Sequence, residues 1–357
     1  MFSMVTLTLL FAGCDLGVVE YIEGSIYWSF ETSGPISSSP VVYDETVYVS
    51  SEDGYFYALG SRSGKERWRF QTGGGSASPV IADDAVFVGA SNGRLYRLST
   101  NTGSEEWSVF LGPGAEITAG VAVEDGVVYV GSKDRSLYAF DAATGEELWS
   151  FPTSNEIHST PAVHNGVVYV GSWDGHLYAV EAADGTQRWK FLAGNYVSGD
   201  PLVAEGQVFI GGEYEVPTAD DGIFHAVNPV GNASWSFWTG EGLHVSGGAT
   251  AAAGVVFFGT QDWYTDDRSD YMHAVSAASG QELWAYATPN SIIGTPTLDG
   301  GLLYFQDEQE FLYVLESSSG EEKWRYPTGG GKSRPAVDDS IVYVGGGNTI
   351  WAVREPR

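Results

Sequence analysis

Short apolar runs separated by polar turn residues recur along most of this chain. In the stretch Ser159–Phe191, the runs VVYV (Val167–Val170) and LYAV (Leu177–Val180) have the aromatic and β-branched composition of period-two β-strands. Asn165-Gly166 and Asp174-Gly175 stand between such runs, and both dipeptides favour two-residue hairpin turns with positive φ. A first strand follows a Thr-Pro pair and a fourth contains a tryptophan. The stretch is therefore predicted to form four antiparallel strands.

This unit repeats along the sequence with a period near 40 residues. The repeat is marked by eight tryptophans, separated by 39 to 42 residues in five of seven intervals and by 46 and 49 in the other two, where the sequence has insertions. Four strands per period of this length is typical of a β-propeller blade. The tryptophans are Trp28, Trp68, Trp107, Trp149, Trp189, Trp235, Trp284 and Trp324.

The ends of the chain indicate how the array closes. Eight first-strand positions are recognisable, at Pro40, Pro79, Gly120, Pro161, Pro201, Ala249, Pro296 and Pro335. The last unit stops at NTIWAVREPR, which matches a third strand, and GSIYWSF around Trp28 matches a fourth strand with no strands before it. We expect this N-terminal strand to complete the last blade and remove the open sheet edges. The predicted fold is an all-β, eight-bladed β-propeller of four-stranded antiparallel blades.

One segment matches a known repeat pattern. Ala139–Trp149, AFDAATGEELW, fits AxDxxTGxxxW, and three further units keep the Ala, Gly and Trp at the same spacing: Ala58–Trp68, Ala179–Trp189 and Ala274–Trp284. Over residues 24–357 the chain resembles the pyrroloquinoline-quinone-like (quinoprotein alcohol dehydrogenase-like) β-propeller repeat family. The resemblance implies that each tryptophan packs against the next blade and that the Thr-Gly turn fixes its approach. Function stays open, because the family includes quinoprotein dehydrogenases and non-catalytic BamB-like propellers.

The charge balance excludes some partners. The chain has 46 acidic and 17 basic residues, a net charge of −29, and only five lysines. No basic stripe is present to neutralise phosphates, so we expect no nucleic acid partner. The acidity serves solubility in one interpretation. In the interpretation that we favour it is a halophilic adaptation, because self-repulsion is screened at roughly 1 M salt, where the Debye length is about 3 Å.

The single cysteine follows a short apolar segment. Residues 1–13, MFSMVTLTLLFAG, end in small residues before Cys14 and resemble a lipoprotein signal peptide, although they lack a basic start and have Phe11 near the cleavage point. The resemblance implies lipidation of Cys14, with residues 14–23 as a linker to the propeller. We expect an exported lipoprotein anchored at the cell surface. Export by another route and a cytoplasmic protein with an apolar N-terminus remain alternatives.

The residues that quinoprotein dehydrogenases use are not found in the sequence. The resemblance implies a quinone stacked between a tryptophan and a disulfide of adjacent cysteines, whereas this chain has one cysteine and is shorter. No Glu/Asn/Asp set matches the calcium and base positions, and GxSxG, HExxH and zinc-type Cys/His spacings are also missing. We expect no catalytic residue and no cofactor, neither PQQ nor calcium. A PQQ-dependent oxidoreductase is kept as the alternative.

Two groups of polar residues have alternative interpretations. His158 and His244 lie a few residues before a first strand, in loops that enter the channel mouth, and are candidate ligand or metal contacts, whereas His176, His225 and His273 are attributed to strand packing. A second group recurs between the second and third strands, and Asx residues are typical of such turns, so the turn interpretation is preferred to a ring of cation ligands. This group is Asp53, Asn92, Asp134 and Asp174.

Two insertions break the regularity. Blade five inserts Gly212–Gly222 and blade six inserts Gln261–Asp270, both between second and third strands, so they should stand side by side on one face. Aromatic and acidic residues in loops on a rigid scaffold are typical of recognition surfaces. A solvated insertion without a partner and a calcium site are the alternatives. The candidate residues are Glu213, Tyr214, Glu215, Asp220, Asp221, Asp262, Trp263, Tyr264, Asp266 and Asp267.

The functional hypothesis combines a complete repeat with no recognisable catalytic motif. We expect a non-catalytic binding or scaffold propeller, BamB-like in architecture and monomeric, whose partner is another protein at the cell surface. The lipid on Cys14 would hold it to the membrane. The alternatives from other classes are the quinone-dependent oxidoreductase and a propeller that binds a small ligand or glycan at the channel mouth.

Overall fold

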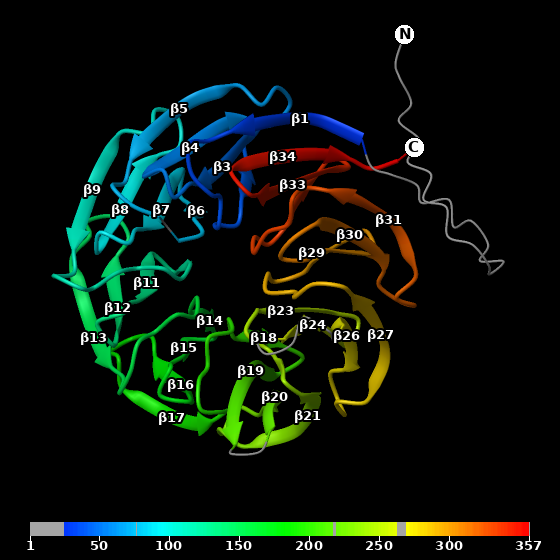
Figure 1. The fold of residues 1–357 in the computed structure, drawn as a ribbon. Coiled ribbons are helices and arrows are strands. Elements are labelled where there is room, and N and C mark those ends of the chain that lie inside the picture. The colour runs from blue at the N-terminus through cyan, green and yellow to red at the C-terminus, as the bar shows by residue number, and fades with distance from the viewer. Residues whose placement is uncertain (1–24, 76, 217–218, 263–268, 357) are drawn as a thin grey trace, which may run out of the picture.

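The computed structural model describes residues 25–75, 77–216, 219–262 and 269–356, and their regular structure is entirely β (Figure 1). Eight four-stranded antiparallel sheets stand around a central opening, in chain order around the ring. The predicted eight-bladed propeller is therefore confirmed. None of the described residues belongs to a helix that would reach across a bilayer.

The first four blades share nearly identical strand lengths. Blade one contains β2 (Val41–Tyr43), β3 (Thr46–Ser50), β4 (Tyr55–Gly60) and β5 (Glu66–Gln71). Blade two contains β6 (Val80–Ala82), β7 (Ala85–Gly89), β8 (Arg94–Ser99) and β9 (Glu105–Phe110). Blade three contains β10 (Val121–Glu124), β11 (Val127–Gly131), β12 (Ser136–Asp141) and β13 (Glu147–Pro152). Blade four contains β14 (Ala162–His164), β15 (Val167–Gly171), β16 (His176–Glu181) and β17 (Gln187–Leu192).

The other four blades include the irregular ones. Blade five contains β18 (Leu202–Ala204), β19 (Gln207–Val216), β20 (Ala219–Val227) and β21 (Ala233–Glu241). Blade six contains β23 (Ala249–Ala252), β24 (Val255–Gly259), β26 (Asp270–Ser276) and β27 (Glu282–Thr288), and β22 (Leu243–His244) pairs with β25 (Gln261–Asp262) beside it. Blade seven contains β28 (Thr297–Asp299), β29 (Leu302–Gln306), β30 (Phe311–Glu316) and β31 (Glu322–Pro327). Blade eight contains β32 (Ala336–Asp338), β33 (Ile341–Gly346), β34 (Thr349–Arg354) and β1 (Ser25–Glu31).

The last blade is built from both ends of the chain. Strand β1 pairs antiparallel with β34, with Phe30 opposite Ile350 and Ile26 opposite Val353. In Figure 1 the blue β1 lies directly beside the red β34. The predicted closure by the N-terminal strand is confirmed, and this pairing connects the first part of the ring to the last.

Burial differs between the strands of one blade. In β15 all five residues are buried, whereas in β17 exposed and half-buried residues alternate. The second and third strands lie between two neighbouring blades, so both of their faces are covered. Successive residues of the VVYV runs are therefore all buried and do not alternate between buried and exposed. The blade-to-blade contacts form the core: Val128 and Phe140 of blade three pack with Phe87 and Leu95 of blade two.

Tryptophans of the fourth strands join each blade to the next. The indole N–H of Trp149 donates to the carbonyl oxygen of Ala182 (2.8 Å), and a Cβ placed on Gly185 would lie 2.8 Å from the same ring. The expected docking onto the Gly-containing turn is thus confirmed. Equivalent bonds run from Trp28 to Ser61, Trp68 to Thr100, Trp107 to Ala142, Trp189 to Pro229, Trp235 to Ala277 and Trp284 to Ser317. Trp324 is buried against blade eight. The third and fourth strands of that blade come from opposite ends of the chain, so no turn connects them and the Trp324 indole has no such turn to dock onto.

The two predicted hairpin turns differ in backbone conformation. Asn165 and Gly166 both have positive φ (51° and 73°), as a two-residue hairpin turn requires. At the second turn the expectation of two positive angles is wrong, because only Gly175 has one (86°). Its N–H bonds the carbonyl of Ser172, which makes a wider turn in which the Asp174 side chain can accept other hydrogen bonds.

Candidate binding site at the channel mouth

Two kinds of connection meet on one face of the ring. The loop from each outer strand to the next inner strand lies beside the turn between the second and third strands. In blade four the N–H of Trp173 donates to Glu156 O (2.9 Å), and in blade five the N–H of Glu213 donates to Tyr196 O (3.1 Å). Glu213 is therefore the structural equivalent of Trp173. We call this side of the ring the mouth face.

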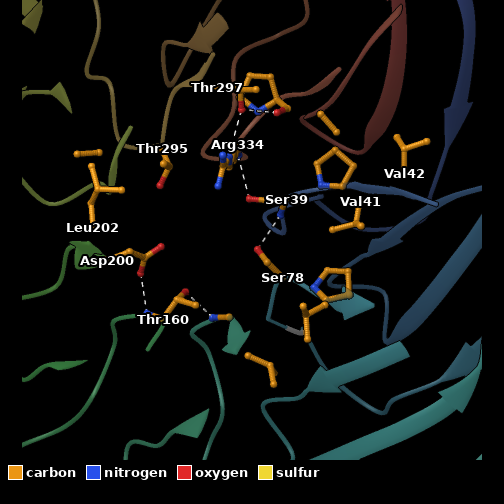
Figure 2. Close-up of a pocket in the computed structure, with 18 of the residues that line it drawn as sticks. Ser39, Val41, Val42, Ser78, Thr160, Asp200, Leu202, Thr295, Thr297 and Arg334 are labelled. Carbon is orange, nitrogen blue, oxygen red and sulfur yellow. Dashed lines mark hydrogen bonds between the residues drawn. The ribbon is translucent and has the colours of Figure 1, made fainter. Parts of the chain in front are cut away.

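The narrow part of the channel, here called the waist, is ringed by the residues that precede the inner strands. Their backbone N–H groups donate to side chains of the neighbouring blade. Such bonds run from Ser39 to Ser78 (2.9 Å), Gly120 to Thr160 (3.0 Å), Thr160 to Asp200 (2.6 Å) and Arg334 to Ser39 (2.9 Å) (Figure 2). The last of these bonds joins blade eight to blade one, so the ring of polar contacts includes the closure.

The register corrects one predicted position. Ala122 pairs with Tyr129 as Ala162 pairs with Tyr169, so Val121 occupies the place of Pro161. Gly120 therefore stands at the waist, one residue earlier than the sequence alignment placed it. This unit has no proline to mark the position, whereas the spacing to the second strand does mark it: Val121 precedes Val127 by six positions, as Pro161 precedes Val167.

Two charged residues face the opening at the waist. Asp200 and Arg334 both point into a cavity of about 520 Å³, whose other lining residues are uncharged (Figure 2). Burial raises the pKa of Asp200, and the hydrogen bonds from Thr160 and the charge of Arg334 oppose this shift. Burial also lowers the pKa of Arg334, against the charge of Asp200. Each of the two groups therefore favours the ionised form of the other across the waist, against the effect of burial.

A second cavity, of about 470 Å³, opens further out on the mouth face. Trp173 and Tyr196 form its aromatic side, with ring centroids 6.0 Å apart and planes at 75°. The loops and turn tips of the following blades supply the remaining walls. We call this cavity the mouth pocket; its other lining residues are Ser198, Glu213, Ser246, Gln261, Ile293 and Lys332.

His158 supports the aromatic side from behind. Its ring stacks on Trp173 with centroids 3.9 Å apart and planes at 18°, and its Nε2 lies 2.7 Å from Glu156 Oε2. Burial lowers the pKa of His158, while Glu156 opposes the shift. The imidazole is therefore neutral at pH 7, and it donates to Glu156. The predicted position of His158 at the mouth agrees with the structure, and its visible role is to hold the indole.

His244 has a different place. It lies in β22 opposite Gln261 of β25, and 2% of its surface is exposed. Its ring is thus beneath the surface and does not line either cavity. The strand-packing interpretation holds for two further histidines. His225 is buried, with Nε2 3.2 Å from Ala193 O, and His273 contacts Glu282 through Nδ1 (2.8 Å).

Polar groups complete the mouth pocket. Glu213 is 4% exposed and accepts a hydrogen bond from the Ser198 hydroxyl (3.2 Å). The Ser246 hydroxyl donates to Gln261 Oε1 (2.7 Å), which fixes the amide. The Lys332 ammonium lies 3.2 Å from Glu308, so an adjacent carboxylate balances its charge.

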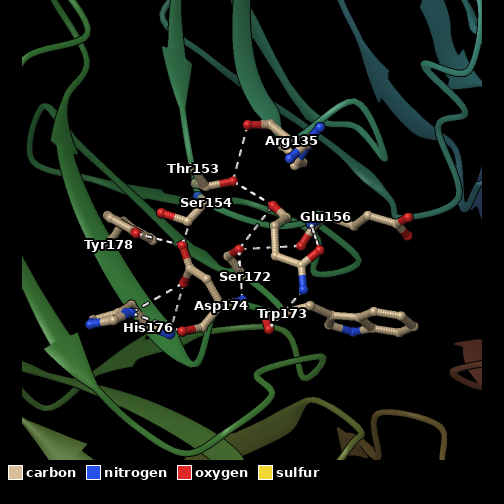
Figure 3. A network of polar contacts seen from close by, with 10 residues as sticks. Arg135, Thr153, Ser154, Glu156, Ser172, Trp173, Asp174, His176 and Tyr178 are labelled. Atoms are coloured by element: carbon tan, nitrogen blue, oxygen red, sulfur yellow. Dashed lines mark hydrogen bonds and ion pairs between the residues drawn. The ribbon is translucent and has the colours of Figure 1, made fainter.

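The turn that carries Trp173 is fastened by an aspartate. Asp174 accepts the Tyr178 hydroxyl (2.7 Å), the N–H of His176 (3.1 Å) and the N–H of Ser154 (2.9 Å) (Figure 3). Burial acts to raise the pKa of Asp174, but these hydrogen bonds lower it. Asp53 and Asp134 each accept a tyrosine hydroxyl in the same way. The turn interpretation of these residues is thus supported, and no group of three metal-ligating side chains occurs among the described residues.

The blade-five insertion continues the blade's own strands. β19 and β20 pair from Val208–Val227 out to Val216–Ala219, and β21 follows as far as Glu241. Strand β22 packs against this hairpin, and β25 contributes Asp262 beside it. The backbones of Tyr214, Glu215, Asp220 and Asp221 belong to the hairpin. The other predicted residues, Cys14, Trp263, Tyr264, Asp266 and Asp267, lie outside the described residues.

The sequence analysis missed Trp173, Tyr196 and Lys332. Trp173 occupies a turn position that is Glu52, Ser91 or Lys133 in the first three blades, so an aromatic residue there departs from the repeat. Comparing equivalent positions between units would have revealed it. The signal at Trp173 was available, because Asp174 aligns with Asp53 and Asn92 in the sequence, whereas the insertions obscure the equivalent positions in blades five and six.

Comparison with known proteins agrees with the geometry. The family model described as outer membrane protein assembly factor BamB matches residues 16–117, 93–215, 163–263 and 219–356. This chain belongs to the BamB family. No curated protein matches it in sequence. BamB from Moraxella catarrhalis is similar in structure, with 17% identity, a TM-score of 0.73, and coverage of 93% of this chain and 100% of that one.

Other solved structures share the fold of this BamB-family chain. The computationally designed Ika8 protein has 16% identity and a TM-score of 0.75, over 91% of this chain and 98% of that chain. Quinohemoprotein alcohol dehydrogenase from Comamonas testosteroni has 14% identity and a TM-score of 0.73, over 93% of this chain and 77% of that chain. At these identities the similarity shows the fold alone.

The residues of this BamB-family chain do not fit the quinone site implied by the dehydrogenase resemblance. That site needs a disulfide of adjacent cysteines, and the chain has one cysteine. The Trp173 ring is also covered on one side by His158, which takes the place of a stacking partner there.

Proposed function

We propose that this chain is a non-catalytic interaction scaffold that binds a protein partner through its mouth face. The blade-five hairpin carries the proposal. β19 has ten residues and β20 nine, whereas the equivalent strands of blade four have five and six. This long hairpin beside an open pocket makes the mouth face asymmetric, and such additions to a scaffold are where binding residues concentrate.

The family supports the same proposal. The matching model describes an assembly factor, a role that consists of contacts with other proteins. The mouth pocket adds an aromatic side and desolvated polar groups, and interface hot spots concentrate in such pockets. A partner that contacts both the hairpin and the pocket would bind across blades four to eight.

We further propose that the propeller is exported and anchored by a lipid on Cys14. Replacing Cys14 with serine removes the thiol that would be lipidated. We expect the Cys14→Ser protein to move from the membrane fraction into the medium, as measured by fractionation and immunoblotting. Retention of the variant in the membrane fraction would exclude this anchor.

Trimming the insertions tests the interaction surface. Deleting residues 214–220 joins Glu213 to Asp221-Gly222, which matches Trp173-Asp174-Gly175 of blade four. Deleting residues 262–268 gives blade six the same turn length. We expect the wild-type chain to capture a protein by crosslinking at native salt, and the doubly trimmed chain to lose it.

A matched control keeps the mouth face and changes the opposite one. Asp125 and Asp339 lie in first turns with φ of 50° and 52°, a conformation that asparagine tolerates. The Asp125→Asn, Asp339→Asn variant should capture the partner as well as the wild type does. Equal capture by the trimmed variant, with its fold verified by circular dichroism, would refute the proposed surface.

A further inference from the structure

One position of the repeat borders the waist in each blade, directly before the inner strand. In six blades it holds glycine, serine or threonine, whereas blade five has Asp200 there and blade eight has Arg334. These two are the charged residues in the lining of the waist cavity, and they depart from the repeat. The eight equivalent residues are Ser39, Ser78, Gly120, Thr160, Asp200, Gly248, Thr295 and Arg334.

The packing of the blades does not require these charges. Ser78 and Thr160 accept the N–H of the preceding blade through a hydroxyl, at 2.9 Å and 3.0 Å. Asp200 accepts the N–H of Thr160 in the same way, at 2.6 Å, so a hydroxyl there would complete the same bond. A guanidinium has no acceptor atom, so the Arg334 side chain cannot take this place in the ring of bonds. The fold thus leaves the charge of Arg334 unexplained.

The Arg334 side chain is held so that it faces the opening. Its Nε donates to the Thr297 hydroxyl (3.2 Å), which in turn donates to Pro335 O (2.6 Å). Among the described residues its two terminal nitrogens have no hydrogen bond or ion pair, and they point into the cavity (Figure 2). The side chain is exposed to the cavity, although the surrounding walls limit its hydration and so lower its pKa. Arginine stays protonated in proteins, so a positive fork faces open space.

An internal ion pair does not occupy this fork. Within the described part of the chain, no hydrogen bond or ion pair joins Arg334 to Asp200, whose carboxylate binds Thr160 instead. The two groups influence each other's pKa at longer range. The terminal nitrogens of Arg334 are therefore available to a ligand.

We propose that the waist cavity binds the carboxylate of a small organic acid with an apolar body, held by the Arg334 guanidinium. The planar fork of arginine matches a carboxylate or a phosphate in bidentate geometry. One guanidinium balances one negative charge, so a doubly charged phosphate would keep an unbalanced charge in a chain of net charge −29. Salt screens the repulsion from the acidic surface, whereas it screens a contact inside the channel less.

The rest of the cavity suits the apolar part of such an acid. Prolines and aliphatic residues, such as Leu202 and Val337, form most of the remaining wall. The volume of about 520 Å³ lies in the range of small-ligand sites.

Isovalerate and isovaleramide test this inference. They have nearly the same shape and differ in charge, so titration calorimetry on the full chain, at neutral pH and fixed sodium chloride, isolates the contribution of the carboxylate. We expect isovalerate to bind one site and isovaleramide to bind at least about tenfold more weakly, because charge-assisted hydrogen bonds to arginine are lost. Inorganic phosphate should also bind more weakly than isovalerate. Equal binding of isovalerate and its amide, binding of neither, or tighter binding of phosphate would overturn the proposal.

Substitutions at the waist locate the site. Arg334→Gln removes the charged fork but keeps the backbone bond to Ser39, so it should weaken isovalerate binding at least about tenfold. Asp200→Asn keeps an acceptor for the Thr160 N–H and cannot carry a negative charge, so it should bind isovalerate at least as tightly as the wild type does. The control is Arg69→Gln, which removes the same charge from the outer strand β5 and should leave binding unchanged.

Circular dichroism verifies the fold of each variant. Unchanged binding in Arg334→Gln, or an equal loss in Arg334→Gln and Asp200→Asn, would refute the assignment of the carboxylate to Arg334. The comparison of the two probes on the wild-type chain depends on no variant. The site lies apart from the proposed interaction surface, so the chain with trimmed insertions should bind isovalerate as the wild type does, whether or not it captures a partner.

Discussion

At the level of single residues, the repeat depends on a tryptophan and a glycine from adjacent blades. Trp149 is 8% exposed, and Gly185 lies against its ring with φ of 74°. The glycine serves two purposes, because its conformation disfavours a side chain and its Cβ position is occupied by the indole. Such pairs explain why tryptophan and glycine persist at constant spacing while other positions vary between units.

Alanine substitutions separate these two contributions. A Cβ on Gly166, which has φ of 73°, meets nothing within 4 Å, so Gly166→Ala should cost about 1 kcal/mol for conformation alone. Gly185→Ala should cost about 1–3 kcal/mol more because of the contact with Trp149. Denaturant unfolding measures both costs. Trp149→Ala itself should cost about 3–5 kcal/mol. In that background Gly166→Ala and Gly185→Ala should destabilise the protein equally, because the contact with the indole is gone. A difference that persists would contradict this explanation.

Two buried ionisable residues make opposite contributions to pH dependence. Burial raises the pKa of Asp270 to about 6, against hydrogen bonds from Ser291 and Thr260, so its stabilising contribution is complete below the ordinary value of 3.8 and is lost as pH rises through about 6. Burial lowers the pKa of His225 to about 4, so its contribution is present above the ordinary value of 6.5 and is lost as pH falls toward about 4.

Replacing Asp270 with asparagine should therefore expose the histidine's effect. Between pH 6.5 and about 4, the free energy of unfolding of Asp270→Asn should fall more steeply with decreasing pH than that of the wild type, because the opposing contribution is gone. Denaturant titrations at constant salt measure the slope. Parallel slopes for the two proteins would show that Asp270 titrates normally.

At the level of elements, strand β1 holds the two ends of the ring together. A chain without β1 would expose the edge of β34, which pairs with Phe30 and Trp28 in the intact protein. We expect the chain starting at residue 32 to associate through this edge and melt at lower temperature, as measured by light scattering and calorimetry. Trp28→Ala keeps the strand but loses the bond to Ser61, so it should not associate through this edge. Association of both variants would point to the tryptophan instead.

At the level of the whole molecule, acidic residues repel one another on the face opposite the mouth. The first turns there carry Asp44, Glu45, Asp83, Asp84, Asp125, Glu205 and Asp339. At roughly 1 M salt the Debye length is about 3 Å, so these repulsions are screened. Lowering the salt lengthens the Debye length, and the carboxylates then repel one another over longer distances. We expect the melting temperature to fall by about 5 °C or more, and an uncharged osmolyte at equal osmolality not to restore it. A melting temperature independent of salt would contradict the halophilic interpretation.

The repeat, the number of blades, the closure and the tryptophan docking could all be predicted from the amino-acid sequence. These features depend on contacts that recur with the period of the chain, so each unit carries the same evidence, as Trp149 and Gly185 do. Which residues line the mouth pocket, in contrast, depends on how the blades pack against one another. Trp173, Tyr196 and Glu213 come from separate blade connections and meet because adjacent blades place equivalent positions side by side around the channel. The repeat constrains the backbone at those positions, and the side chains that it leaves variable form the pocket.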